Sequence, residues 1–587
     1  MVHMQLNRKI KFSTLARLIL VSILWAACQS QGDEDVLTPP FVDVSEAAGI
    51  TAIHKGIWDE DGGGGYLGVG QAWGDYDNDG WVDLFVTGNL ASNVLYHNNQ
   101  DGTFSVSPLS SDVSMPNATT GGAVWVDYDN DGWSDLYVLA EGSNALWHND
   151  AGIGFTDVTA VANLGNGGEG QTAAWADYDG DGFLDVYVVN WTCAPECDPL
   201  DISQHKDALY HNNGDGTFTD VSDSLEYEKL LGAGFTASFV DFDNDQDLDL
   251  YVVNDKFRNP IGNVLWRNDG AGCGSWCWTD VSSESGTNVI LNGMGLAIGD
   301  YDNDGDLDFY FSTMKNPMNL LQNQGNGTFI DVSEEAGVAG SSSILVGWGT
   351  AFFDYDNDGW LDLYLATTKV YRALSRMAPE SMLSDSPNAL FHNNGDGTFM
   401  DVFAAGWDDV QHPSMGIAYA DYDNDGWMDF VVGNWNEGYR LYRNQGSDGA
   451  TNHWLTLNLI GSGPVNRDAV GARVYLTTDD GSTQMQELKS GSSLGAGNDI
   501  RLHFGLGNAA IRDVKVVWPD GLTRIFHNVA SDQILHLNYA DKGDADNEGR
   551  RYGATTASVI GFAVLVLGAS WIIFQRFKTS ELRSRNL

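Results

Sequence analysis

The chain has 587 residues and a formal net charge of −51, from 81 acidic and 30 basic side chains. A field this negative repels polyanions, which excludes nucleic acid as a predicted partner. With 43 % hydrophobic residues and 20 tryptophans, core size is no limitation.

Residues 1–28 are predicted to be a signal peptide. The first 32 residues contain no acidic side chain, and four basic residues precede an apolar run from Leu18 to Ala27. This is the pattern of an export signal rather than of a folded element. The end of the run, Trp25–Cys28, resembles a bacterial lipobox, in which Cys28 would be lipidated. Ordinary signal cleavage nearby is the alternative.

One phrase then recurs seven times. The first copy, from Gly74 to Val86, reads GDYDNDGWVDLFV, and the others begin at residues 126, 176, 240, 299, 353 and 420. A second phrase follows, such as KDALYHNNGDGTFTDV from Lys206, whose Asn-Gly-Asp-Gly run predicts a hairpin turn. The aromatic and β-branched runs around these turns predict about four short strands in each unit, the size of a propeller blade.

The ends of this region predict a closed ring. A closing-strand phrase occurs at Phe41, before any acidic loop, whereas the seventh unit continues from Arg440 without one. An N-terminal strand that completes the last blade would leave no exposed edge. We therefore predict an all-β fold with a seven-bladed β-propeller over residues 41–448; an open superhelix is the alternative.

Each repeated phrase carries four aspartates with the spacing D-x-D-x-D-x-x-x-D. Glycine stands at the sixth position in six of the seven copies, and Gln246 is the exception. This matches the front of a calcium loop, with the ninth position supplying a further carboxylate. Four carboxylates within a few ångströms repel one another or bind protons, and a hard divalent cation removes that conflict. Solvated acidic turns are the alternative.

We number the loops in chain order and the positions within each loop from its first aspartate. The predicted ligands of up to seven Ca²⁺ ions are Asp75, Asp77, Asp79 and Asp83 in loop 1; Asp127, Asp129, Asp131 and Asp135 in loop 2; Asp177, Asp179, Asp181 and Asp185 in loop 3; Asp241, Asp243, Asp245 and Asp249 in loop 4; Asp300, Asp302, Asp304 and Asp308 in loop 5; Asp354, Asp356, Asp358 and Asp362 in loop 6; and Asp421, Asp423, Asp425 and Asp429 in loop 7.

These units resemble the FG-GAP/VCBS repeats of integrin α-type propellers. The resemblance covers about 400 residues and implies that each loop binds calcium between strands of its blade.

Residues 452–540 change character. Alternating runs such as LTLNL and VKVV predict a small β-sandwich. The segment resembles the ASPIC/UnbV domain, which follows FG-GAP repeats in the cartilage acidic protein family. The positions that match that family's pattern are Arg467, Gly471, Arg501, Trp518, Pro519, Asp520 and Gly521. Without the family, the last four indicate only a turn that closes a strand.

The C-terminal end predicts a membrane anchor. An acidic linker over residues 541–553 precedes 18 uncharged residues, 557–574, which predict one transmembrane helix. The basic tail over residues 575–587 indicates a cytoplasmic end, with the propeller outside. We expect a single-pass protein at the cell surface or facing the periplasm; a buried core helix is the alternative.

Beyond Cys28 the chain has four cysteines, in two short loops. In an exported chain an even number favours disulfides, and local pairing of Cys193 with Cys197 and of Cys273 with Cys277 is the first of three connectivities. A four-cysteine zinc site is the alternative.

The sequence shows no catalytic constellation. His97, His148, His211 and His392 recur at one slot that Arg267 and Arg443 fill elsewhere, which indicates a scaffold position. We find no nucleophile elbow, zinc-protease helix or phosphate loop. We expect a non-enzymatic, calcium-binding protein of adhesion or macromolecular recognition, with an extracellular or periplasmic protein or glycan as partner. The alternative is an extracytoplasmic propeller hydrolase or lyase acting on polysaccharide.

Overall fold

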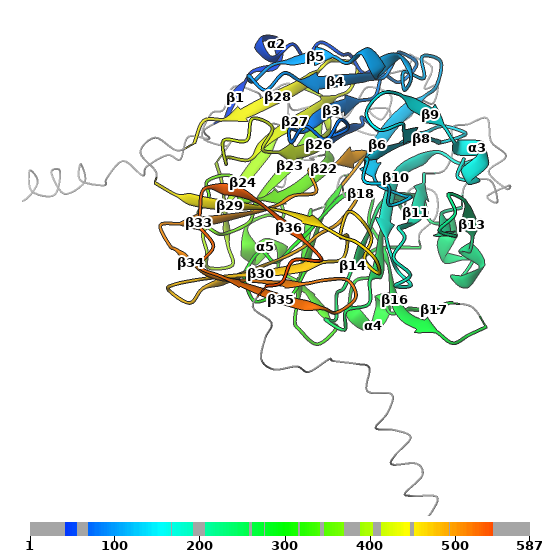
Figure 1. Cartoon of the computed structure of the whole chain (residues 1–587). Helices are drawn as coiled ribbons and strands as arrows, with labels where there is room; N and C mark the ends of the chain where they lie inside the picture. The colour runs from blue at the N-terminus through cyan, green and yellow to red at the C-terminus, as the bar shows by residue number, and fades with distance from the viewer. Residues whose placement is uncertain are drawn as a thin grey trace, which may run out of the picture.

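The computed structural model describes residues 41–55, 68–165, 167–191, 206–256, 261–274, 276–314, 317–340, 346–368, 388–402, 412–446, 451–491 and 493–543. Within them the fold is all-β apart from single helical turns, and most strands form repeated four-stranded sheets. Both features confirm the predicted all-β class, and the repeated sheets are consistent with a β-propeller (Figure 1).

Each repeated sheet holds one acidic loop between its first and second strands, so we give the sheets the numbers of their loops. Sheet 1 contains β2 (Gln71–Gly74), β3 (Asp83–Val86), β4 (Val94–Asn98) and β5 (Phe104–Val106), and sheet 2 contains β6 (Thr120–Val126), β7 (Asp135–Ala140), β8 (Ala145–Asn149) and β9 (Phe155–Asp157). Sheet 3 contains β10 (Gly170–Ala176), β11 (Asp185–Asn190), β12 (Ala208–Asn212) and β13 (Phe218–Asp220), and sheet 4 contains β14 (Gly234–Val240), β15 (Asp249–Asn254), β16 (Val264–Ala271) and β17 (Trp276–Asp280). Sheet 5 contains β18 (Gly293–Gly299), β19 (Asp308–Thr313), β20 (Asn319–Asn323) and β21 (Phe329–Asp331), and sheet 6 contains β22 (Val346–Phe353), β23 (Asp362–Thr368), β24 (Ala389–Asn393) and β25 (Phe399–Asp401). Sheet 7 contains β26 (Ser414–Ala420), β27 (Asp429–Asn434), β28 (Tyr439–Asn444) and β1 (Phe41–Asp43).

Single helical turns follow many of the fourth strands. They are α2 (Ser45–Ala48), η1 (Pro108–Ser111), α3 (Thr159–Ala162), η3 (Ser222–Ser224), η4 (Lys229–Leu231), α4 (Ser282–Ser285) and α5 (Ser333–Ala336). In the part of the chain that the structure describes, no helix has the length and apolar character needed to cross a membrane. The predicted transmembrane helix, residues 557–574, lies outside that part, as do the signal segment and Cys28.

The first strands of the sheets contact one another in cyclic order. Each first strand lies against that of the next sheet, and β26 of sheet 7 lies against β2 of sheet 1. The N-terminal strand β1 pairs antiparallel with β28, with Phe41 opposite Asn444, and so completes sheet 7 as expected.

Aromatic contacts join each sheet to the next. The aromatic residue at loop position 2 packs on the aromatic residue that begins or lies in the fourth strand of the following sheet, with ring centroids 5.4 to 6.2 Å apart. The pairs are Tyr76–Phe155, Tyr128–Phe218, Tyr178–Trp278, Phe242–Phe329, Tyr301–Phe399, Tyr355–Phe41 and Tyr422–Phe104. Such pairs add about 0.5–1.5 kcal/mol each beyond the area that they bury. The aspartates of each loop are therefore fixed beside a sheet-to-sheet contact.

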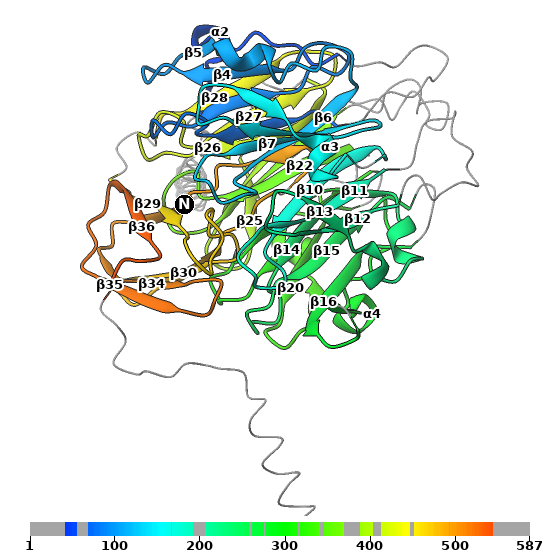
Figure 2. The ribbon, with the colours of Figure 1, turned by 45° about the vertical axis from the view of Figure 1, so that its right-hand side comes forward.

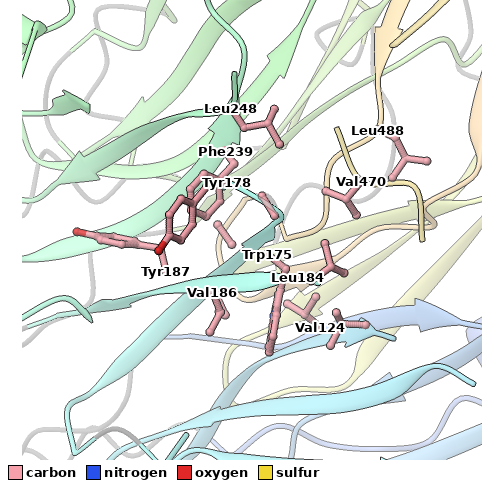
Figure 3. Packing of buried hydrophobic residues seen from close by; sticks show 14 of the residues in the cluster. Val124, Trp175, Tyr178, Leu184, Val186, Tyr187, Phe239, Leu248, Val470 and Leu488 are labelled. Atoms are coloured by element: carbon pink, nitrogen blue, oxygen red, sulfur yellow. The ribbon is translucent and has the colours of Figure 1, made fainter. Parts of the chain in front are cut away.

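Two further sheets follow the repeats and lie beside them (Figures 1 and 2). One contains β33 (Leu502–Gly507), β29 (His453–Ile460) and β36 (Gln533–Asn538), and the other β31 (Thr483–Glu487), β30 (Arg473–Thr478), β34 (Ile511–Val517) and β35 (Thr523–His527). We call this part the sandwich. Its core is continuous with that of sheets 2 to 4, since Val470 and Leu488 belong to the same buried cluster as Trp175 and Leu184 (Figure 3).

One segment of the sandwich enters the ring of first strands. Its strand β32 (Ala496–Gly497) pairs parallel with β2. Around it, the backbone of Ser490 accepts a hydrogen bond from Trp175 in β10, and Ser493 Oγ accepts one from the N–H of Thr350 in β22. In the figures β32 lies among the repeated strands, apart from the other strands of the sandwich (Figures 1 and 2). The sandwich is thus anchored through the middle of the repeats.

Candidate metal centres

The acidic loops share one backbone design. In loop 1 the two oxygens of Asp75 accept hydrogen bonds from the backbone N–H groups of Asp79 (3.0 Å) and Gly80 (2.8 Å). The Asp79 carboxylate accepts one from the N–H of Trp81 at 2.9 Å. The same three bonds recur in the other loops. The loop therefore wraps around its own carboxylates and holds them at short range.

Position 6 of each loop has left-handed backbone. The six glycines there have φ between 87° and 93°, and Gln246 in loop 4 is held at 76°. Side chains other than glycine are disfavoured in this region, because Cβ approaches the backbone. Loop 4 thus keeps the loop shape against the preference of its residue.

Position 9 places a carboxylate inside the protein. Asp83 is 1 % exposed and accepts hydrogen bonds from the N–H groups of Asn98 (2.8 Å) and Tyr76 (3.3 Å). Burial, together with the charges of Asp77 and Asp75, raises the pKa of Asp83 to about 9. Burial also raises the pKa of the position-9 carboxyls in the other loops. Without added positive charge, such carboxyls hold protons, and a divalent cation would replace them.

Buried oxygens without hydrogen-bond partners show that these residues fit a cation. The Oδ1 atom of the position-3 aspartate is buried and unpartnered in six loops, at Asp77, Asp179, Asp243, Asp302, Asp356 and Asp423. In loop 2 the orphan atom is Oδ2 of Asp135, whose side chain is fully buried. A buried carboxylate oxygen without a partner is costly, and calcium takes six to eight such oxygens. Positions 1, 3, 5 and 9 would hold the ion, whose charge would neutralise the loop.

The recurring histidines lie against the loops. His97 Nδ1 in β4 is 3.3 Å from both Asp77 Oδ2 and Asp83 Oδ1, and His148, His211 and His392 are placed alike. In sheet 5 the same slot holds Gln322, which donates to Asp302 at 2.6 Å. The slot therefore contacts the second oxygen of the position-3 aspartate. The sequence identified these histidines only as scaffold.

A set of asparagines was missed by sequence reasoning. The residue after each slot is asparagine, and its Nδ2 donates at 2.7–2.8 Å to the position-2 carbonyl of the preceding loop. These residues are Asn98, Asn149, Asn212, Asn268, Asn323, Asn393 and Asn444. The bond from Asn98 reaches Tyr422 of loop 7, so the chain of contacts is cyclic. Their presence in all seven repeats was the signal that could have revealed them.

Position 4 links the loops directly. Asn78 Nδ2 donates to the carbonyl of Gly132 in loop 2, and Asn424 of loop 7 donates to that of Gly80 in loop 1. Equivalent bonds to the position-6 carbonyl of the next loop leave Asn130, Asn303 and Asn357. Asn244 of loop 4 instead donates to the Asp306 carboxylate of loop 5, and loop 3 has Gly180 at this position. Neighbouring loops are thus in direct hydrogen-bond contact.

The sandwich covers part of the loop face. Arg501 donates to the Asn424 side chain (3.0 Å) and the Asp421 carbonyl (3.1 Å), and Arg473 makes the same two contacts with Asn244 and Asp241. Of the other residues in the predicted domain pattern, the backbone N–H of Arg467 donates to Asn130, and Trp518 is buried against Tyr539. The sequence pattern identifies Arg501 and Arg467 but not Arg473, which lies in a plain strand pattern.

The cysteines divide between described and undescribed residues. Cys273, which follows β16, forms a disulfide with Cys277 in β17, and this confirms local pairing there. Cys193 and Cys197 lie outside the described residues.

Repeated four-stranded sheets, each with one acidic loop between its first and second strands, define a class of repeat protein, and family comparison identifies it. FG-GAP-like repeats match residues 75–138, 127–188, 200–252, 241–311, 300–365 and 381–432, and an ASPIC and UnbV domain matches residues 462–544. The chain belongs to the FG-GAP-like repeat family.

Among individual proteins, the chain is similar to cartilage acidic protein 1. It is 24 % identical to the Xenopus tropicalis protein over 572 residues, which span 91 % of this chain and 82 % of that protein. It is 23 % identical to the Homo sapiens protein over 386 residues, 57 % of this chain and 58 % of that protein. The chain therefore spans little more than half the length of the human relative.

Several solved β-structures are distantly similar. They include an Agrocybe aegerita lectin that recognises terminal N-acetylglucosamine (TM-score 0.36, 18 % identity, 58 % of this chain and 84 % of that chain) and the lectin BP39L from Burkholderia pseudomallei (0.37, 9 %, 65 % and 98 %). A Trypanosoma rangeli sialidase scores 0.34 at 9 % identity over 69 % of this chain and 59 % of that chain. With scores below 0.5, none of these bears on the function.

Proposed function

We propose that this protein is a membrane-tethered, extracytoplasmic seven-bladed β-propeller that binds calcium in its acidic loops and acts in adhesion or macromolecular recognition. Calcium at up to seven loops would stiffen one face of the ring, which the sandwich partly covers. The opposite face would then bind a protein or glycan partner. The transmembrane segment over residues 557–574 would hold this assembly outside the membrane.

The contrast between the two ends of the sheets carries this proposal. The acidic loops keep nine positions in every sheet, whereas the connections between second and third strands, at the other end, vary from 4 to 20 residues. A rigid scaffold with loops of variable length at one end is the usual arrangement of a recognition surface. The family relation to cartilage acidic protein 1, a protein named for cartilage, supports an extracellular place for the chain.

Binding arrays separate recognition from the enzymatic alternative. Full-length protein in detergent would be applied to glycan and matrix-protein arrays, once in millimolar calcium and once in chelator. We expect calcium-dependent binding without turnover of the bound ligand. Release of shortened glycans from any hit would instead support a polysaccharide hydrolase or lyase.

A further inference from the structure

The loops differ in the charge that faces their carboxylates. Among the described residues, lysine or arginine side chains lie within ion-pair distance of loop aspartates only at loops 4 and 7. The slot next to loops 1, 2, 3 and 6 holds histidine, and next to loop 5 it holds Gln322. Next to loop 4 it holds Arg267, which pairs with Asp269 outside the loop. The seven copies of one motif are therefore not one kind of site.

Loop 7 is the clearest case. Arg443, in the slot that holds histidine next to loops 1, 2, 3 and 6, places Nε 2.6 Å from Asp423 Oδ2 and Nη2 3.2 Å from Asp425 Oδ2. These aspartates occupy positions 3 and 5, two of the four predicted ligands. One guanidinium thus engages half of the carboxylates that the cation would use.

At loop 4 the arginine that pairs with a loop aspartate comes from the sandwich and not from the slot. Arg473 of the sandwich, 7 % exposed, places Nη1 3.2 Å from Asp241 Oδ2 at position 1. Glu487 pairs with the same guanidinium at 2.9 Å and offsets part of its charge. Loop 4 also has Gln246 where the other loops have glycine. Loop 7, where Arg443 has no such acid partner among the described residues outside the loop, is therefore the better place for a test.

We propose that the loops form two classes of cation site: loops 1, 2, 3, 5 and 6 bind calcium, and in loops 4 and 7 arginine replaces much of the cation's charge, so that calcium binds there at least tenfold more weakly. The inference rests on the proposed calcium-binding function. Ligand charge sets calcium affinity in oxygen sites, and a guanidinium both occupies carboxylate oxygens and repels the arriving ion. Unlike an amide or an imidazole, a guanidinium has no accessible neutral form.

Calcium counting tests the two classes. Full-length protein would be dialysed against a series of buffered free calcium concentrations, and bound metal measured by elemental analysis. We expect a first plateau near five ions per chain and a rise toward seven only at concentrations at least tenfold higher. A single step to seven ions would overturn the two classes and leave calcium binding intact. Absence of bound calcium would overturn both.

Reciprocal substitutions assign the classes to loops. Arg443→His gives loop 7 the slot residue of loop 1 and should raise the first plateau by one ion. His97→Arg does the reverse and should lower it by one. Arg440→His is the matched control, because Arg440 lies in the same strand but pairs with Asp43, outside any loop. It should leave the plateau unchanged.

The test does not require both reciprocal variants to fold. Near-ultraviolet circular dichroism shows which of them is folded, and the plateau of one folded variant is then compared with that of the wild type. If His97→Arg retains the wild-type plateau while folded, or if Arg440→His shifts it as much as Arg443→His does, the assignment to the slot arginine is wrong.

Discussion

Loops 1 and 7 are neighbours in the ring and carry the same four aspartates, yet their surroundings differ. His97 faces loop 1, which has no ion pair with lysine or arginine in the described residues, whereas Arg443 and Arg501 both contact loop 7. A motif specifies the backbone of a loop, because its hydrogen bonds are internal. The charge that the loop needs from outside is set by whatever the fold brings next to it.

Removal of calcium should have the largest effect. Extracellular sites with dissociation constants of roughly 10⁻⁴ to 10⁻³ M would each add about 0.4–1.4 kcal/mol at millimolar calcium, or about 2–7 kcal/mol for five loops. Chelator should therefore lower the melting temperature by several degrees.

Hydrogen exchange should separate loop 1 from loop 7. In chelator, β2 and β3 beside loop 1 should lose more protection than β26 and β27 beside loop 7. Equal losses in both places would contradict a difference between them.

Much of this comparison could be predicted from the sequence. The spacing of the aspartates located every loop, and the unmatched phrase at Phe41 predicted that β1 completes sheet 7. The loops could be predicted because their motif is local in the sequence, and the closure by β1 because the strand phrases could be counted. The contacts of Arg473 and Arg501 could not be predicted, because residues separated by up to 232 positions meet there only after the sandwich docks. The entry of β32 into the ring belongs to the same class of unpredictable contact.

Arg473→Met should have the next largest effect. The substitution leaves the buried Glu487 and Asp241 without their cation, and breaking a buried ion pair in this way costs about 3–5 kcal/mol. If arginine stands in for calcium at loop 4, added calcium should stabilise the variant more than it stabilises the wild type. Denaturant unfolding in calcium and in chelator measures both quantities. The control is Arg440→Met, which removes a partly exposed pair with Asp43 and should cost about 0–1 kcal/mol in either condition.

Asp207→Asn should have a smaller and opposite effect. Asp207 directly precedes β12, at a buried position that holds Asn93, Asn144, Asn263 and Asn388 in other sheets. Its burial raises the pKa of the carboxyl to about 8. A raised pKa means that the carboxyl favours the folded state fully below its ordinary value of 3.8, and that this contribution is lost as pH rises through about 8.

The amide variant has no such loss. Its advantage in unfolding free energy should be smallest near pH 4, grow toward pH 8 and then level off. Chemical denaturation of both proteins at several pH values measures the difference. Because the loop aspartates titrate equally in the two proteins, their contribution cancels. A difference that is flat with pH would mean that Asp207 is compensated by a group not recognised here.

Gln246→Gly should give the smallest effect and bears on why loop 4 departs from loop 1. Gln246 is held at φ 76°, where loop 1 has Gly80 at 89°. Relief of left-handed strain at one residue is worth about 1 kcal/mol, so the variant should unfold at slightly higher denaturant concentration. Gly80→Gln is the reciprocal control: a Cβ at Gly80 meets no atom within 4 Å, so its expected loss of about 1 kcal/mol would come from backbone strain alone. If Gly80→Gln destabilises while Gln246→Gly does not stabilise, contacts of the Gln246 side chain with the sandwich near Gly521 outweigh the strain. Loop 4 would then be shaped by docking of the sandwich more than by the needs of a cation.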